Sequence, residues 1–353
     1  MSEFVIIYFA LLVIASCGAA YYGQRPAFLT LFSLTLVSFV LGIVGGVSAL
    51  QFVALAAGLL AFAAGISYSF REFLVAITKG NLSKELKTAP LTAAFGMFVI
   101  FTYAIAGIFA PFIAPYGEAE VIAAAFAPAD EKMLLGADQL GRDKFRRLLY
   151  GARNTVGLAL VATSAAFFMG ATAGLLAATK GGWCELFMGR FADVVMSIPS
   201  LIFALLMLSI FGPEIHVIII AVAIIYAPRV FRLTRAVAGN VVVMDYIEAA
   251  KLRGEGTGYL IRREILPNAT APLVAEFGLE FCFVFLLVAG LSFLGLGIQP
   301  PTADWGSMVR ENATLISFGV VTPLIPAAAI ALLTVAVNFV VDWMLFRSSG
   351  LKE

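Results

Sequence analysis

Long stretches of the chain carry no charged side chain, and this feature limits the folds open to it. The longest runs from Pro26 to Phe70, 45 residues without Asp, Glu, Lys or Arg. A membrane-spanning helix needs about 20 mostly apolar residues, so this stretch is long enough for two, with a break near Gly45-Gly46. The chain is 61% hydrophobic and 13% charged, whereas a soluble domain is about half apolar and a quarter charged. The sequence therefore predicts an all-α polytopic membrane protein.

The apolar runs and the polar breaks between them predict about nine membrane spans. These are residues 4–24, 27–47, 51–70, 91–112, 154–179, 194–213, 215–236, 272–297 and 318–344. Glu3 is the only charge before the first span, and a signal peptide needs a basic start, so we expect no cleaved leader. Between the spans, we expect residues 114–150 and 180–193 to form loops.

Lys and Arg in the connecting segments predict the orientation, because they favour the cytoplasmic side. With residues 237–271 in the cytoplasm, the linker at 71–90 and its four basic residues also lie there. One segment disagrees, since four basic residues fall outside: Arg142, Lys144, Arg146 and Arg147. Apolar residues interleave with them, so we expect an amphipathic helix at the outer membrane interface.

Several function classes are disfavoured by composition. The net charge of +1 gives no basic field that would suggest nucleic acid. Three widely spaced cysteines and a single histidine, His216, indicate neither a disulfide framework nor a metal site. The chain has no GxxxxGK[ST] pattern, so we expect it neither to hydrolyse ATP nor to act as an enzyme or hold a cofactor.

One polar segment between two spans carries a dense pattern, YIEAAKLRGEGTGYLIRREILPN at residues 246–268. It begins with Glu248, Ala249 and Ala250, and Gly254 follows shortly after. Leu266-Pro267 closes it. The alanines are small helix formers that let a partner approach closely. Gly254 can adopt positive φ and turn the chain out of a helix, while Pro267 tends to begin or end an element. These residue types suit a segment that a partner protein can approach closely.

The order and spacing of these residues resemble the EAA loop of ABC-importer permeases. The resemblance implies a short cytoplasmic docking helix that binds the ATP-hydrolysing subunit. Three further stretches resemble the C-type permease subunit of dipeptide, oligopeptide and nickel importers. They are LLGADQLGRDKFRRLLYGAR at 134–153, ADVVMSIPSLIFALL at 192–206 and LSFLGLGIQPPTADWGSMV at 291–309. The likeness covers residues 91–345, and residues 1–88 lie outside it.

The resemblance implies an ABC type I importer permease core of six helices at residues 89–353, preceded by a three-helix membrane extension at 1–88. It implies a multi-pass subunit of the inner (plasma) membrane that translocates short peptides or similar small solutes. Its partners would be a second permease, separate ATP-binding subunits and an extracellular or periplasmic solute-binding protein, the last meeting loops near 116–150 and 299–311. The coupling loop would be 237–271. Nickel, opine and sugar-oligomer cargo remain open.

Charged residues within the spans form a second group of candidates. Glu276 and Glu280 lie one helical turn apart on one face, and a carboxylate inside a span is costly and suggests function. They either pair with Arg262 or Arg263 near the cytoplasmic interface, or line the pathway or contact the paired permease.

Three arginines in the span 215–236 recur every three residues, and we expect them to anchor the helix at the headgroups: Arg229, Arg232 and Arg235.

Two other function classes remain as alternatives. A secondary transporter could use Glu276 and Glu280 as ion or proton sites, although no repeat of broken helices is visible. A membrane-embedded enzyme could place a site at Asp138, Arg142 and Asp143, although no nucleophile and base accompany them. ATP dependence separates the importer from the first alternative, and turnover by the isolated chain would support the second.

Overall fold

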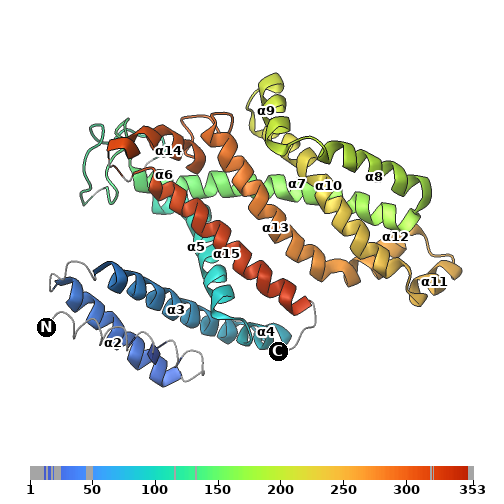
Figure 1. The fold of residues 1–353 in the computed structure, drawn as a ribbon, viewed down its shortest axis with the longest axis horizontal. Helices are drawn as coiled ribbons and strands as arrows, with labels where there is room; N and C mark the ends of the chain where they lie inside the picture. The colour runs from blue at the N-terminus through green and yellow to red at the C-terminus, as the bar shows by residue number, and fades with distance from the viewer. Residues whose placement is uncertain are drawn as a thin grey trace. The chain divides into compact units, whose positions relative to one another are not determined.

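The protein is helical, as the sequence predicts, and it divides into two compact units (Figure 1). The computed structural model describes residues 12, 15–16, 19, 25–44, 51–114, 117–131, 133–318, 320 and 322–348. These residues contain isolated β-bridges but no strand, so the predicted all-α class is confirmed. The first unit comprises residues 1–98 and the second residues 99–353.

The first unit is a pair of long helices followed by a short one. It contains α2 (Arg25–Val44), α3 (Gln51–Ile77), α4 (Asn81–Lys87) and the start of α5 (Leu91–Ile113). The ring of Phe28 in α2 lies 5.0 Å from the ring of Tyr68 in α3. The Arg71 guanidinium donates to the Ala89 carbonyl at 3.1 Å, which ties α3 to the segment before α5.

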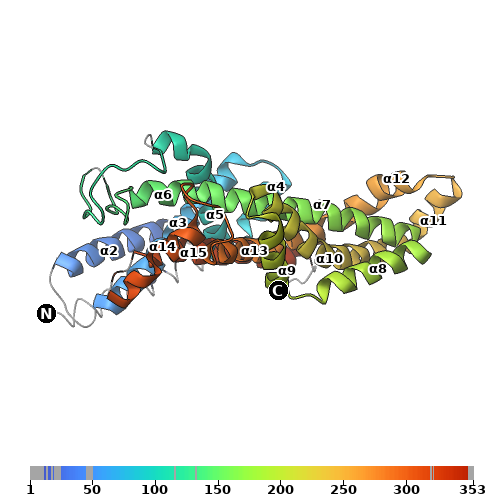
Figure 2. The same ribbon diagram turned by 90° about the horizontal axis from the view of Figure 1, so that it is seen from above.

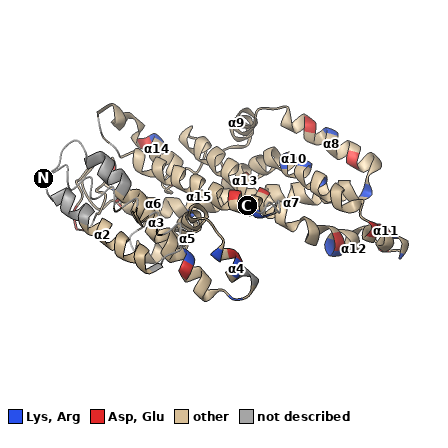
Figure 3. Cartoon of the chain, turned by 60° about the horizontal axis from the view of Figure 1, so that its bottom comes forward, with Lys and Arg blue, Asp and Glu red and all other residues tan. Residues whose placement is uncertain are grey.

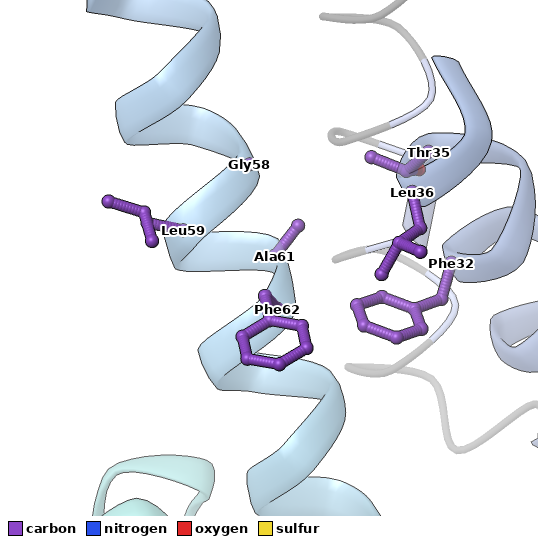
Figure 4. A pocket seen from close by; sticks show the side chains of 7 residues that line it. All are labelled: Phe32, Thr35, Leu36, Gly58, Leu59, Ala61 and Phe62. Carbon is purple, nitrogen blue, oxygen red and sulfur yellow. The ribbon is translucent and has the colours of Figure 1, made fainter. Parts of the chain in front are cut away.

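An apolar groove of about 280 Å³ lies between α2 and α3 (Figure 4). It is lined by Phe32, Thr35, Leu36, Gly58, Leu59, Ala61 and Phe62. Further along the same pair, a side chain at Gly65 would collide with the Phe32 ring. The two helices therefore pack closely at Gly65 and leave the groove beside it.

The second unit holds the remaining helices. After the end of α5 come α6 (Lys144–Gly151), η1 (Ala152–Val156), α7 (Gly157–Lys180), α8 (Gly182–Met196), α9 (Ser200–Phe211), α10 (Ile215–Val242), α11 (Asp245–Leu252), α12 (Thr257–Tyr259), η2 (Leu260–Ile265), α13 (Leu266–Phe293), α14 (Trp305–Asn312), η3 (Ala313–Phe318) and α15 (Leu324–Ser348). The segments from α6 to α7 and from α12 to α13 each run as one long helix, over 144–180 and 257–293.

The α7–α10 pair is the tightest packing in this unit, and glycine makes it possible. A Cβ at Gly174 would lie 2.7 Å from the Thr234 Cβ and 2.8 Å from the Phe231 carbonyl oxygen. A Cβ at Gly170 would likewise collide with the backbone at Ala227. Small residues at a helix interface let two backbones approach, which is a main source of stability in a bilayer. Residues 154–179, which are rich in Gly and Ala, thus pack closely against α10.

The region 180–213 differs from the prediction of a loop followed by one span. Residues 182–196 form α8, and α9 follows at an angle of 84°. The break falls at Ser197–Pro199, where proline offers no amide to the helix and restricts the residue before it. The charges of 180–193 suggested a loop, but Glu185 pairs with Arg235 of α10 at 3.2 Å. The pair joins α8 to α10.

Within the described residues, six helices are long and apolar enough to cross a membrane, and the α8–α9 pair is a seventh candidate. The predicted span at 27–47 coincides with α2, of which residues 26–37 count as a shorter apolar helix. The first predicted span, 4–24, lies almost entirely outside the described residues, so the total of nine stays a prediction. The long helices carry few charges (Figure 3).

Within the second unit, the polar segments gather at two opposite ends. The helices α11 and α12 lie at one end, and α6 and α14 lie at the other (Figures 1 and 2). The helices α7, α10 and α13 run between them. This arrangement puts the 246–268 segment and the 134–153 segment on opposite sides of the apolar helices, as the predicted topology requires.

Candidate functional site

The EAA triplet lies in α11, a helix of eight residues that follows α10 after a sharp turn. Asp245 and Glu248 occupy its first turn, where negative side chains are favoured by the helix dipole. The α12 and η2 segments then lead back into α13. The predicted docking helix is therefore present as a helix, held between two long apolar ones.

A small apolar core fixes α11 to the rest of the unit. Ile247 and Ala250, one turn apart on α11, are completely buried. They pack in one cluster, which we call the coupling core, and its members come from α7, α10, α11 and η2: Leu175, Ala238, Ile247, Ala250, Leu260 and Ile265. Ala250 therefore faces its own chain and seats the helix, so of the two alanines only Ala249 is free to meet a partner. Any displacement of α11 acts directly on the ends of α7 and α10.

The opposite side of α11 is exposed and unusually apolar. Glu248 and Ala249 are exposed there, and large hydrophobic side chains of α11 and of the segments just before and after it are exposed as well. Val243 is 79% exposed and Leu252 84% exposed. Met244, Tyr246 and Tyr259 also stand open to solvent. Exposed apolar patches rimmed by polar residues mark interaction surfaces. We call these five side chains with Glu248 and Ala249 the docking face.

Gly254 ends α11 in the way its position in the motif predicts. Its φ is +83°, the left-handed region that glycine enters without steric cost. Its amide donates to the Lys251 carbonyl at 2.9 Å, and the Glu255 amide donates to the Ala250 carbonyl at 3.2 Å. This pair of bonds is the Schellman motif that closes many helices. A Cβ at Gly254 would touch nothing within 4 Å, so backbone conformation alone calls for glycine.

Leu266 and Pro267 lie at the far end of the segment, where they begin α13 rather than closing a loop. Proline in the first turn of a helix needs no donor, and Pro267 occupies that position. Both residues are exposed. Glu264, in η2, accepts from the Asn268 side chain through its carbonyl at 2.6 Å. These residues therefore set the path by which the docking segment re-enters the spans.

Glu276 and Glu280 have a different surrounding from the one expected near the cytoplasmic interface. Glu280 is 1% exposed, and its Oε1 lies 3.3 Å from Nε of Arg229 in α10. Of the two readings left open by the sequence, the structure does not show the pairing with Arg262 or Arg263: within the described residues Glu280 pairs with Arg229 instead. From the sequence alone, Arg229 is expected at the lipid headgroups, because its partner Glu280 lies on another helix, α13.

Two of the three α10 arginines have carboxylate partners that their spacing does not predict. Arg229 pairs with Glu280 of α13, and Arg235 pairs with Glu185 of α8. Arg232 contacts the Met196 sulfur at 4.0 Å. Arg229 therefore contacts α13, whereas Arg232 and Arg235 contact α8.

At the opposite end of the unit, four charges form a buried cluster that sequence spacing did not reveal. We call it the four-charge cluster: Asp138, Arg142, Arg147 and Glu311. Arg142 Nε lies 2.7 Å from Asp138 Oδ2, and Arg147 Nη1 lies 3.0 Å from Glu311 Oε2. Arg142 and Arg147 are thus buried and paired. Their charges are neutralised within the protein, and α6 itself is helical as predicted.

Electrostatics favours the charged form of Asp138. Burial alone raises its pKa, but hydrogen bonds from the Arg142 and Leu140 amides and from the Arg147 guanidinium outweigh burial and lower the pKa below its ordinary value. The Glu311 carboxylate comes from α14, far along the chain. The four-charge cluster therefore locks the 114–150 segment to α14.

A second set of contacts joins the same two segments. Trp305 is 1% exposed, and its indole donates to the Leu148 carbonyl at 2.9 Å. Asp304 accepts from the Thr155 hydroxyl at 2.8 Å. Burial raises the pKa of Asp304. The two segments predicted to meet a solute-binding protein are thus packed into one platform.

Comparison with known proteins identifies the chain. Residues 170–348 match the family of binding-protein-dependent transport system inner membrane components. The chain belongs to this family. It is a multi-pass permease component of a transport system in the inner membrane.

Curated relatives of this permease cover most of its length. The dipeptide transport system permease protein DppC of Alkalihalophilus pseudofirmus is 33% identical over 73% of this chain and 85% of that protein. The di/tripeptide transport system permease protein DppC of Pseudomonas aeruginosa is 33% identical over 70% and 84%. The probable D,D-dipeptide transport system permease protein DdpC of Escherichia coli is 31% identical over 73% and 86%.

The matched part of the permease contains most of the geometry described above. It begins in α7 and ends in α15. It therefore includes the docking face, the whole coupling core, the Arg229–Glu280 pair and Glu311, while the other three members of the four-charge cluster precede it.

Proposed function

We propose that this permease forms half of the transmembrane pathway of an ATP-driven importer for short peptides. The observation that carries the proposal is the docking face. It is an apolar surface outside the long helices, on a helix whose other side is seated in the coupling core. The peptide cargo is supported by the relatives, which are named as dipeptide and di/tripeptide permeases. The other half of the pathway would be a second permease subunit.

The docking face would bind a separate ATP-binding subunit. The chain has no GxxxxGK[ST] sequence, so we infer that it holds no ATPase site and takes its energy from that partner. ATP binding must favour one arrangement of the complex over the other to drive a change of state. Movement of the partner would displace α11, and the coupling core would pass the displacement to α7, α10 and η2.

A solute-binding protein would meet the opposite end. There the four-charge cluster and the Trp305 contacts hold the 114–150 segment and α14 together as one platform. Because the platform and the docking face lie at opposite ends of the same long helices, a single rigid unit could connect cargo delivery on one side with ATP use on the other.

Copurification and uptake test this proposal together. The tagged permease is purified from its own membranes in mild detergent, its partners are identified by mass spectrometry, and dipeptide uptake is measured in cells. We expect an ATP-binding subunit and a second permease to copurify. Gly254→Pro or Glu248→Arg should lose the ATP-binding subunit and abolish uptake while the permease remains in the membrane. Normal uptake by both variants would refute docking at α11.

A further inference from the structure

Three charged side chains lie on two neighbouring helices, Arg229 on α10 and Glu276 and Glu280 on α13. At ~1.5 Å per residue, Arg229 lies about 20 Å from either end of α10. Glu280 lies about 20 Å from the C-terminal end of the long helix 257–293. Glu276 precedes Glu280 by one turn. A charged side chain within a span is costly, faces protein or water rather than lipid, and is a functional-site candidate.

The three charges are only partly satisfied by one another. The Glu280 Oε1 atom faces Arg229, but Oε2 is buried and has no hydrogen-bond partner in the described part of the chain. Arg229 rests on the Phe283 ring, with 4.4 Å from its guanidinium carbon to the ring centre. Its side chain is still 42% exposed. Glu276 is half-buried and makes no ion pair with any described residue. One cation and one carboxylate thus remain open to a ligand.

The face of α10 that carries Arg229 changes from buried to exposed along the helix. In the half of α10 before Arg229, this stripe is buried at Ile218, Val222 and Ile225. From Arg229 onwards the stripe is exposed, at Arg232, Ala236 and Asn240. The buried half is apolar, whereas the exposed half carries an arginine and an asparagine. Arg229 therefore marks the point on this face where burial gives way to exposure.

The spacing of the open charges fits a small zwitterion. Glu276 and Glu280 are separated by one helical turn, a rise of about 6 Å, and Arg229 is held at the level of Glu280. An extended chain advances at most about 3.6 Å per residue, so the two ends of a dipeptide lie roughly 7 Å apart. A guanidinium binds a carboxylate through two parallel hydrogen bonds, and a free carboxylate binds an ammonium group.

We propose that Arg229 and Glu276 form a transit site for short peptides, binding the terminal carboxylate and the terminal ammonium respectively. Glu280 is a positioning residue that holds Arg229 in place. The proposal rests on the function inferred above, since it requires peptide cargo. A site on a pathway must bind strongly enough to admit its solute and weakly enough to release it. This one uses one side chain at each end of the peptide, and it selects peptides whose two ends are free.

The test compares solutes that differ only at their ends: dialanine, N-acetyl-dialanine and dialanine amide. Uptake is measured in vesicles containing the complete importer and its binding protein. Glu276→Gln should lower dialanine uptake about tenfold or more, the worth of a hydrogen bond to a charged group, and leave N-acetyl-dialanine uptake unchanged. The double variant Arg229→Gln with Glu280→Gln should lower uptake of dialanine and N-acetyl-dialanine but not of the amide.

Comparing variant with wild type for each solute cancels the preference of the binding protein, because that protein is unchanged. The matched control is Arg235→Gln with Glu185→Gln, which removes the other ion pair made by α10. It should change uptake of all three solutes by one common factor. If the transit-site variants also lower all three solutes by a common factor, or stop copurifying with the second permease, their role is structural and the proposal fails.

A second measurement removes the binding protein altogether. Saturation-transfer NMR on the purified permease–ATPase complex should detect dialanine on the wild type and lose the signal in Glu276→Gln. Equal signals from both, or none from the wild type, would overturn the transit site. If either of these NMR results is obtained while the wild-type importer still carries dipeptides in vesicles, only the transit site is refuted. If the wild type carries no dipeptide at all, the proposed function itself is wrong.

Discussion

Replacing Gly254 tests the coupling helix with a magnitude that the structure sets. A Cβ at Gly254 meets nothing within 4 Å, and the same is true at Gly256. The two positions differ in backbone conformation, since φ is +83° at Gly254 and −76° at Gly256. A left-handed conformation costs an ordinary L-residue about 1–2 kcal/mol. Gly254→Ala should therefore destabilise the end of α11 by that amount, and Gly256→Ala should not.

A destabilised end of α11 should also weaken docking of the ATP-binding subunit. A loss of 1–2 kcal/mol changes an equilibrium by a factor of about 5–30, so Gly254→Ala should weaken binding of the ATP-binding subunit by up to that factor. Asparagine tolerates the left-handed region better than alanine, so Gly254→Asn should weaken binding less. Gly254→Pro should weaken it most, because proline cannot adopt this φ and loses the amide that donates to the Lys251 carbonyl.

The assay is binding of the purified ATP-binding subunit to the permease pair in nanodiscs, at equal permease content for every variant. The expected order of affinity is wild type and Gly256→Ala together, then Gly254→Asn, Gly254→Ala and Gly254→Pro. Equal affinity for Gly254→Ala and Gly256→Ala would show that the helix end does not contribute to docking, and would refute the reasoning.

Three further predictions concern the rest of the permease. Glu311→Gln removes a partner from buried Arg147 and should lower stability by roughly 1–3 kcal/mol, seen as a lower melting temperature in detergent; no change would mean that the cluster is not a lock. Gly170→Val should lower the free energy of unfolding by about 1–3 kcal/mol or more through overpacking. Gly239→Val should lower it less, because a Cβ at Gly239 has no neighbour within 4 Å. Similar melting temperatures for the two variants would contradict the close α7–α10 contact. Because the pKa of Asp138 is lowered on folding, its stabilisation should be complete above about pH 4 and lost as the pH falls further; Asp138→Asn should flatten this loss, and an unchanged slope would contradict it.

Much of the helical framework could be predicted because a bilayer imposes it. A run such as 26–70 has no charge to place it in water, and the structure forms α2 and α3 there. The docking helix was also visible, since the EAA triplet and Gly254 stand at helical and capping positions that local sequence determines. The inward packing of Ala250 was not visible, because its neighbours come from α7, α10 and η2.

Ion pairs between segments that are far apart in the chain could not be predicted from the sequence. Glu185, Arg190 and Asp193 make residues 180–193 resemble a loop, yet most of this segment forms α8, and Glu185 pairs with Arg235 of α10. Spacing alone gave Arg229 no partner, since Glu280 lies on another helix. In each case the missing information is which helices are neighbours in space, and a local pattern does not contain it.

The central claim is that the docking face binds an ATP-binding subunit, and site-specific photocrosslinking in living cells tests it most directly. The crosslinker replaces Leu252, which is 84% exposed on α11. The matched control replaces Val121, which is 63% exposed at the opposite end of the unit. The account predicts a covalent adduct with an ATP-binding subunit from position 252 and none from position 121. An importer that still takes up dipeptide but forms no such adduct from position 252 would contradict it.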